Sequence, residues 1–102
     1  MNWQPCINGF RAYMLLERSL SQHTIEAYLG DVGKLVQFLA LSEHDIGPEQ
    51  VQTDTLSAFL MWLNELGLGA RSQARLLSAL KTFYKYLLTE NIVQTDPTEL
   101  LE

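Results

Sequence analysis

Four of the seven basic side chains of this 102-residue chain lie within residues 66–89, a segment that contains no Asp or Glu. They are Arg71, Arg75, Lys81 and Lys85. All twelve carboxylates lie outside this segment, although the formal net charge of the chain is −5. Guanidinium and ammonium groups without neighbouring carboxylates favour binding to a polyanion, because counterions are released where positive charge is concentrated.

The spacing of these basic residues is helical. At about 100° per residue, one stripe of a helix would carry polar side chains. They are Arg71, Arg75, Ser78, Thr82 and Lys85, with Lys81 at the edge of the stripe. The opposite side would carry Leu76, Leu80, Phe83, Tyr84 and Leu87. An ordinary solvated face is the alternative interpretation, but such faces usually interleave both signs of charge as (i, i+4) pairs.

Tyrosine hydroxyls are among the groups that can act as nucleophiles towards a phosphate. The chain has four of them, at Tyr13, Tyr28, Tyr84 and Tyr86. A nucleophilic tyrosine needs cationic side chains that bind the charge developing on the phosphate. None of the four has a set of Arg and His residues next to it in the sequence, so we predict core positions or positions beside the core. We expect no catalytic residue in this chain.

Cysteine and histidine are too scarce for a disulfide framework or a metal site. Cys6 is the only cysteine, and His23 and His44 are the only histidines. A thiolate–imidazole site would therefore need several carboxylates, and we expect no metal and no cofactor. No apolar run approaches the roughly 20 residues that cross a bilayer, and the N-terminus does not resemble a secretory leader. We expect a cytoplasmic protein that does not contact a membrane.

Four helices and no strand are predicted from the periodicity of the apolar residues. The first covers about residues 5–18, and the second opens at Ser21, a good N-cap residue. Thr53 is expected to cap the third, which ends at Gly67, and the fourth covers about residues 70–90. The core face of the third helix is predicted to carry Leu56, Phe59, Leu60, Leu63 and Leu66.

The size and the connections indicate one small all-α domain. A length of 102 residues with 47% hydrophobic content suits a single modest core. The longest irregular connection covers residues 41–52, with a short turn expected around residues 48–51. We predict a domain over residues 1–95, built from four main helices as crossed hairpins. Residues 96–102 would then begin a linker or a short fifth helix, with Asp96 placed before Pro97.

Three segments carry motifs that occur together in one known protein family. They are S-x-x-T-x-x-x-Y from Ser21, A-R-L-L-S-A-L-K-x-F-Y-x-Y-L from Ala74, and D-P at Asp96. In this order and spacing, roughly from residue 10 to residue 101, the chain resembles the N-terminal core-binding domain of tyrosine recombinases. The bacterial Xer recombinases are the most similar type.

The resemblance implies a SAM-like helical domain that forms one half of a C-shaped clamp around double-stranded DNA. The other half would be a catalytic domain with an active site of Arg, Lys and His residues and a tyrosine nucleophile. That domain is expected to be missing here, so this chain alone should not cut DNA, whereas a parent protein would be an enzyme. Other recombinase protomers would be partners on DNA, and the isolated chain is expected to be a monomer.

The resemblance also implies that the N-terminal turns of the second and fourth helices face the major groove of DNA. The implied contacts are Ser21, Gln22, His23, Thr24 and Ala27, together with Ala70, Arg71, Ser72, Gln73, Arg75 and Lys81. Helix N-termini present free N–H groups to phosphates, and Arg can read guanine while Gln can read adenine. Glu26 and Asp31 depart from this pattern, because carboxylates near DNA repel phosphates.

Not every implied contact is equally specific. Arg71 and Arg75 are the strongest candidates, whereas Ser21 is better explained as a helix cap and Thr24 could satisfy a local backbone group. His23 could equally be an exposed residue of a first helical turn without a role.

Two other functions are compatible with a small helical domain. A helix-turn-helix regulator would need a short recognition helix after a turn of three or four residues, and both residues 41–52 and the last helix are long for that. A protein interaction module of the SAM or death-domain kind fits the size and acidity but leaves the acid-free stripe unexplained. The target sequence, and a role in chromosome-dimer resolution, integration or inversion, stay open.

Overall fold

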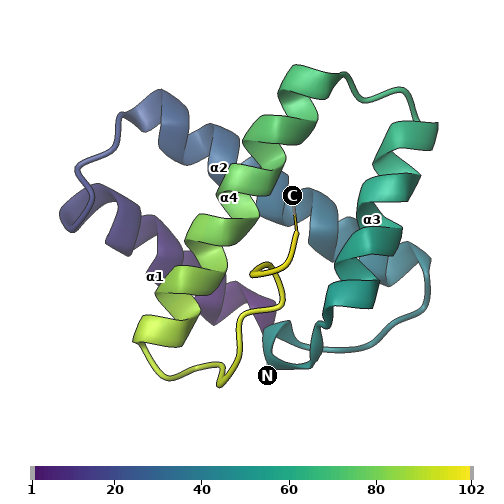
Figure 1. Ribbon diagram of the computed structural model, residues 1–102. Helices are drawn as coiled ribbons and strands as arrows, with labels where there is room; N and C mark the ends of the chain where they lie inside the picture. The colour runs from purple at the N-terminus through teal and green to yellow at the C-terminus, as the bar shows by residue number, and fades with distance from the viewer. Residues whose placement is uncertain (1, 102) are drawn as a thin grey trace.

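The computed structural model describes residues 2–101, which are helical with no strand. The elements are α1 (Trp3–Leu16), α2 (Gln22–Leu41), the 3-10 helix η1 (Pro48–Gln50), α3 (Thr53–Glu65) and α4 (Ala70–Thr89). The helices α1 and α2 form one hairpin, α3 and α4 form a second, and α4 crosses α2 (Figure 1). The predicted all-α bundle of four main helices is confirmed.

The first helix starts and ends two residues earlier than predicted. Asn2 caps it, because the side-chain oxygen of Asn2 accepts a hydrogen bond of 3.2 Å from the backbone N–H of Gln4. Pro5 lies in the first turn, where a helix has no use for the missing N–H. At the other end, Ser19 takes a left-handed conformation with φ of 51°, which turns the chain towards α2.

The other helix ends follow their local signals, with one exception. Ser21 caps α2 as predicted, since its hydroxyl oxygen accepts from the N–H of Thr24 at 3.1 Å. Gly67 ends α3 with a φ of +89°, a conformation that favours glycine. The prediction that Thr53 caps α3 is wrong. Thr53 is the first residue of the helix, preceded by Gln52, and its hydroxyl donates to the carbonyl of Pro97 at 2.9 Å.

Side chains from all four helices meet in one core, and α4 lies against both α1 and α2. The apolar side of α4 is buried as predicted, whereas Leu66, expected in the core, is 65% exposed beyond the end of α3. The largest fully buried side chains are Phe10, Met14, Ile25, Val32, Leu35, Leu56, Phe59, Leu76, Leu80, Phe83, Tyr84 and Leu87. The core therefore fixes the position of α4 relative to α2.

Residues 96–101 fold back against α3 and α4 (Figure 1). The carboxylate of Asp96 accepts from the backbone N–H and the hydroxyl of Thr98, at 2.8 and 2.6 Å. Thr98 is buried, and the carbonyl of Leu101 accepts from the ammonium of Lys81 at 2.9 Å. These described residues form turns, so the fifth helix considered from the sequence is not formed there, and Glu102 lies outside the described range.

Candidate nucleic-acid interface

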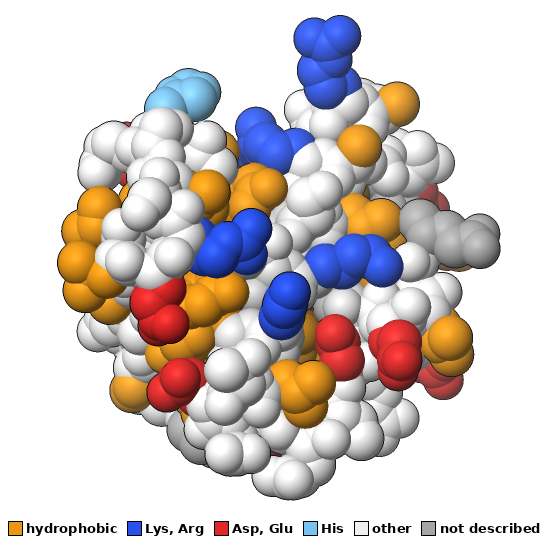
Figure 2. Space-filling model, turned by 60° about the vertical axis from the view of Figure 1, so that its left-hand side comes forward, with side chains coloured by type: hydrophobic (Ala, Val, Ile, Leu, Met, Phe, Trp, Pro, Cys, Tyr) orange, Lys and Arg blue, Asp and Glu red, His pale blue; other side chains and the backbone are white. Residues whose placement is uncertain are grey.

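The N-terminal turns of α2 and α4 lie along the same, upper side of the molecule in Figure 1. On the face drawn in Figure 2, the Lys and Arg side chains occupy the upper and central parts, and most of the acidic side chains lie lower. The separation of charge seen along the sequence is therefore also a separation on this face.

The first turn of α2 offers two exposed polar side chains. Gln22 and His23 are exposed and form no side-chain hydrogen bond within residues 2–101. The hydroxyl of Ser21 is occupied, because it accepts from the N–H of Thr24 and donates to the Thr24 hydroxyl at 3.0 Å. Thr24 and Ala27 are half-buried. The cap interpretation of Ser21 agrees with this geometry.

The first turns of α4 contain one basic residue that is unpaired within the described residues, Arg71, and one residue, Gln73, whose side chain contacts neighbouring parts of the fold. Ala70 and Arg71 are exposed, and Arg71 makes no side-chain hydrogen bond or ion pair in the described part of the chain. Gln73 donates to the carbonyl of Leu68 at 2.9 Å and to the side-chain oxygen of Asn64 at 3.3 Å. Ser72 is half-buried. Gln73 thus ties α4 to the turn before it and to α3.

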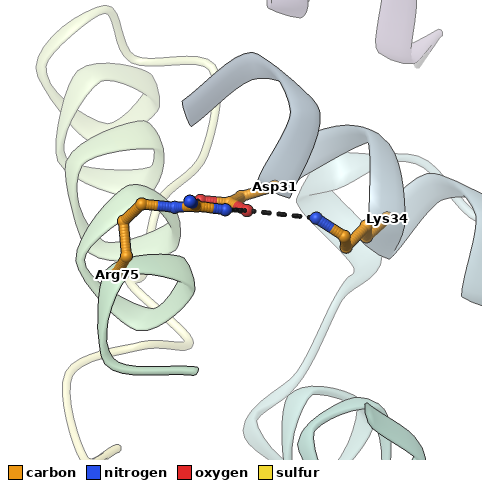
Figure 3. A network of polar contacts seen from close by, with 3 residues as sticks. All are labelled: Asp31, Lys34 and Arg75. Atoms are coloured by element: carbon orange, nitrogen blue, oxygen red, sulfur yellow. Dashed lines mark hydrogen bonds and ion pairs between the residues drawn. The ribbon is translucent and has the colours of Figure 1, made fainter. Parts of the chain in front are cut away.

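Arg75 is held by a carboxylate from another helix. Its Nε donates to Oδ2 of Asp31 at 2.9 Å, and its Nη2 donates to Oδ1 at 2.7 Å (Figure 3). The Asp31 side chain has no exposed surface, while that of Arg75 is 44% exposed. Lys34, one turn along α2, lies 3.4 Å from Oδ1 of the same carboxylate. Hydrogen bonding to Asp31, followed by its charge, raises the pKa of Arg75.

Asp31, one of the two acidic departures from the basic pattern, is not an uncompensated surface charge. The carboxylate is buried, and two cations compensate its charge. Lys34 lies outside the basic segment 66–89, and no role was predicted for it. The (i, i+3) spacing of Asp31 and Lys34 was a usable signal, whereas Arg75 lies 44 residues further along and nothing local indicates the pairing.

Lys81, by contrast, is directed to the C-terminal segment. It is half-buried, and its ammonium donates to the carbonyl of Leu101. Lys85, further along the same stripe, is exposed. The three basic residues in the first two thirds of α4 thus differ. Arg71 is unpaired within the described residues, Arg75 is bound to a carboxylate, and Lys81 is bound to the C-terminal segment.

The tyrosines of α4 are core residues, as predicted. The Tyr84 ring is fully buried, and its hydroxyl donates to the carbonyl of Pro48 at 2.8 Å. Burial raises the pKa of Tyr84 well above its ordinary value, and burial is also the main cause that raises the pKa of Tyr86. A buried phenol with a raised pKa is a poor nucleophile. Tyr13 and Tyr28 are half-buried.

Over residues 2–101, no group of three or more His, Cys, Asp or Glu side chains is arranged to hold a metal ion. Within the same residues, none of the helices combines the length and apolar character needed to cross a membrane. Cys6 is buried in the core, and this burial raises the pKa of its thiol.

Comparison with known proteins identifies similar chains. The family model described as "Phage integrase, N-terminal SAM-like domain" matches residues 7–91. Tyrosine recombinase XerD of Chlorobaculum tepidum is 36% identical over 97 residues, covering 95% of this chain and 31% of the relative. Tyrosine recombinase XerC of Herpetosiphon aurantiacus is 36% identical over 100 residues, which is 97% of this chain and 32% of the relative.

Tyrosine recombinase XerD of Pseudomonas aeruginosa is 39% identical over 95 residues, or 92% of this chain and 31% of the relative. The chain thus spans about a third of the length of the curated relatives that it matches.

Proposed function

Since the chain belongs to the family of phage integrase N-terminal SAM-like domains, we propose that it binds duplex DNA as the N-terminal part of a site-specific tyrosine recombinase of the Xer type. The observation that carries this proposal is the similarity to recombinases named XerC and XerD, which extends over nearly the whole chain. The parent enzyme would work in the bacterial cytoplasm, where the chromosome is.

The surface of α4 supports the choice of DNA as the ligand. Arg71 is exposed and unpaired within the described residues, and it stands in the first turn of the helix. The N-terminus of a helix carries free N–H groups and a partial positive charge, and both favour a phosphate. No carboxylate of residues 66–89 opposes this, because that segment has none.

In the proposed complex the domain is one half of a clamp around the duplex. The N-terminal turns of α2 and α4 face the DNA, and Gln22, His23, Arg71 and Arg75 are the exposed side chains proposed to contact it. Residues 96–101 lead towards a catalytic domain that holds the tyrosine nucleophile, and other recombinase protomers assemble on the same DNA. Lys81 contributes less than its sequence position suggests, because its ammonium is bound to the carbonyl of Leu101.

A fluorescence-anisotropy titration with a 30-bp duplex at several salt concentrations tests this function. We expect weak binding, because the chain has twelve carboxylates and only seven cations, and its net negative charge repels DNA. With three or four phosphate contacts, the slope of log K against log salt should be about −3 to −4. Absence of binding at low salt, together with self-association, would instead support a protein interaction module.

A further inference from the structure

We propose that Asp31 is a positioning residue that orients the guanidinium of Arg75 for a two-point contact with O6 and N7 of a guanine. The inference rests on the proposed function, because it names the DNA group that one residue of that surface reads. The inference adds to the proposed function a role for Asp31, a buried acidic residue that pairs with a basic residue of the surface.

One edge of the Arg75 guanidinium remains available for a ligand. A guanidinium has five N–H donors in a planar fork. Asp31 takes Nε and one donor of Nη2. Nη1 makes no hydrogen bond within residues 2–101, so the Nη1/Nη2 edge is left with at least one donor on each nitrogen. Two neighbouring donors in one plane match two neighbouring acceptors.

The free edge of the guanidinium is held in a fixed orientation. Asp31 is fully buried on α2, and Arg75 reaches it from α4 (Figure 3). Both helices are fixed by the core, in which Val32 and Leu35 of α2 and Leu76 of α4 are completely buried. A two-point hydrogen bond between groups on two fixed helices holds the plane of the guanidinium, so the free edge keeps one direction before any ligand arrives.

The charge of the Asp31–Arg75 pair favours a base over a phosphate as the group that Arg75 contacts. A phosphate contact draws its free energy largely from positive charge and counterion release. The charge of Arg75 is already compensated by Asp31, and Lys34 alone restores one positive charge beside the pair. What the pair adds is direction, and a bidentate Arg contact to O6 and N7 is the commonest specific base contact in the major groove.

The experiment compares three 20-bp duplexes by fluorescence anisotropy: alternating dG–dC, the same duplex with 7-deazaguanine, which lacks N7, and alternating dA–dT. The unmodified chain should bind the dG–dC duplex roughly tenfold more tightly than the 7-deazaguanine duplex, because 7-deazaguanine keeps O6 but lacks one of the two acceptors of the charged guanidinium. This comparison needs no substitution and therefore does not depend on the folding of a variant.

Asp31→Asn gives the sharper test, because it removes the buried negative charge that pairs with Arg75. If Asp31 positions Arg75, this variant should bind the dG–dC duplex no more tightly than the 7-deazaguanine duplex, although its net charge is more positive. Arg75→Lys keeps the charge without the planar fork, and it should lose the preference as well. Lys85→Gln, at an exposed position of the same stripe, should weaken binding to all three duplexes equally and keep the preference.

Circular dichroism and thermal melting show whether each variant is folded, and Arg75→Lys carries the test if Asp31→Asn is not. Equal binding of the unmodified chain to the dG–dC and 7-deazaguanine duplexes would overturn this inference alone. Tighter binding of a folded Asp31→Asn variant to all three, with the preference retained, would overturn it too. Failure of the unmodified chain to bind any duplex would overturn the proposed function and this inference together.

Discussion

The hydroxyl of Tyr84, in the C-terminal half of α4, donates a hydrogen bond of 2.8 Å to the carbonyl of Pro48, which lies in η1 between α2 and α3. The Tyr84 side chain has no exposed surface, so water cannot replace this bond. The bond attaches the connection between α2 and α3, the longest of the domain, to α4. A second hydrogen bond holds the same connection to α1, since Nε1 of Trp3 donates to the carbonyl of Ile46 at 2.9 Å.

Replacing Tyr84 with Phe should lower the free energy of unfolding by about 1–2 kcal/mol. The ring would still fill the core, but the carbonyl of Pro48 would be buried without its donor. Urea denaturation followed by circular dichroism measures the change. A difference within error would mean that water reaches this carbonyl after all.

The same tyrosine should make the domain sensitive to alkaline pH. Burial raises the pKa of Tyr84 above the ordinary value of 10.0, so the folded state holds the phenol proton more tightly than the unfolded state. The resulting stability is fully present below about pH 10 and declines as the pH rises further. Melting temperatures measured from pH 8 to about pH 11 should fall more steeply for the unmodified chain than for Tyr84→Phe. Cys6, whose pKa burial also raises, leaves part of the decline in both.

Gly9 of α1 is required by the close approach of Tyr86 from α4. A Cβ at this position would collide with the Tyr86 hydroxyl and lie 3.1 Å from Cζ. The ring is packed against Phe10 and Tyr13, with centroids 6.1 and 5.1 Å away, so it cannot retreat freely. Gly9→Ala should cost about 1–2 kcal/mol of stability, because overpacking exceeds the gain in helix propensity.

Two matched variants separate overpacking from helix propensity. In a Tyr86→Phe background, which lacks the hydroxyl, Gly9→Ala should cost at least about 1 kcal/mol less. Gly30→Ala in α2, where the new Cβ would have no atom within 4 Å beyond its chain neighbours and the nearby backbone of the helix itself, should stabilise by about 0.5–1 kcal/mol. Equal effects of Gly9→Ala in both backgrounds would contradict the account.

Arg71 and Arg75 should differ in their effect on folding although both lie on the basic stripe. Arg71→Ala should change stability by less than about 0.5 kcal/mol, because the side chain is exposed and unpaired in the described range. It should weaken DNA binding, with the salt slope reduced by about one if Arg71 holds a phosphate.

Arg75→Ala should cost about 1–2 kcal/mol of stability, since it leaves the buried Asp31 carboxylate with Lys34 alone. The cost stays below the value for a fully buried pair because Arg75 is 44% exposed. Thermal and urea unfolding of the two variants side by side provide the measurement. Equal stabilities would show that the Asp31–Arg75 pair does not support the fold.

Residues 96–101 should contribute to stability although they form no helix. A chain that ends at residue 95 loses the acceptors of Thr53 and Lys81 and the buried Pro97 and Thr98. We expect a loss of about 1–3 kcal/mol in urea unfolding. Leu100→Ser is the control, because Leu100 is 81% exposed and should tolerate the change. A truncated chain as stable as the full one would show that this segment is only loosely attached.

The existence of the helices, most of their ends and the buried side of α4 could be read from the sequence alone. These features depend on short-range signals: a 3.6-residue period, a serine at Ser21 that caps α2, and a glycine at Gly67 that takes a positive φ. The motifs beginning at Ser21 and Ala74 likewise indicated the family, because their order along the chain is itself a property of the sequence.

Only the tertiary structure decided which polar side chains of the stripe are available. In the sequence, Arg71, Arg75 and Lys81 are equivalent as basic residues of a segment without carboxylates. In the structure, Arg75 is bound to Asp31 and Lys81 to the carbonyl of Leu101. Those partners are 44 and 20 residues away. Such pairings depend on where α2, α4 and the C-terminal segment cross, and the packing of the whole core determines these crossings, whereas the period of a helix is determined by its own backbone.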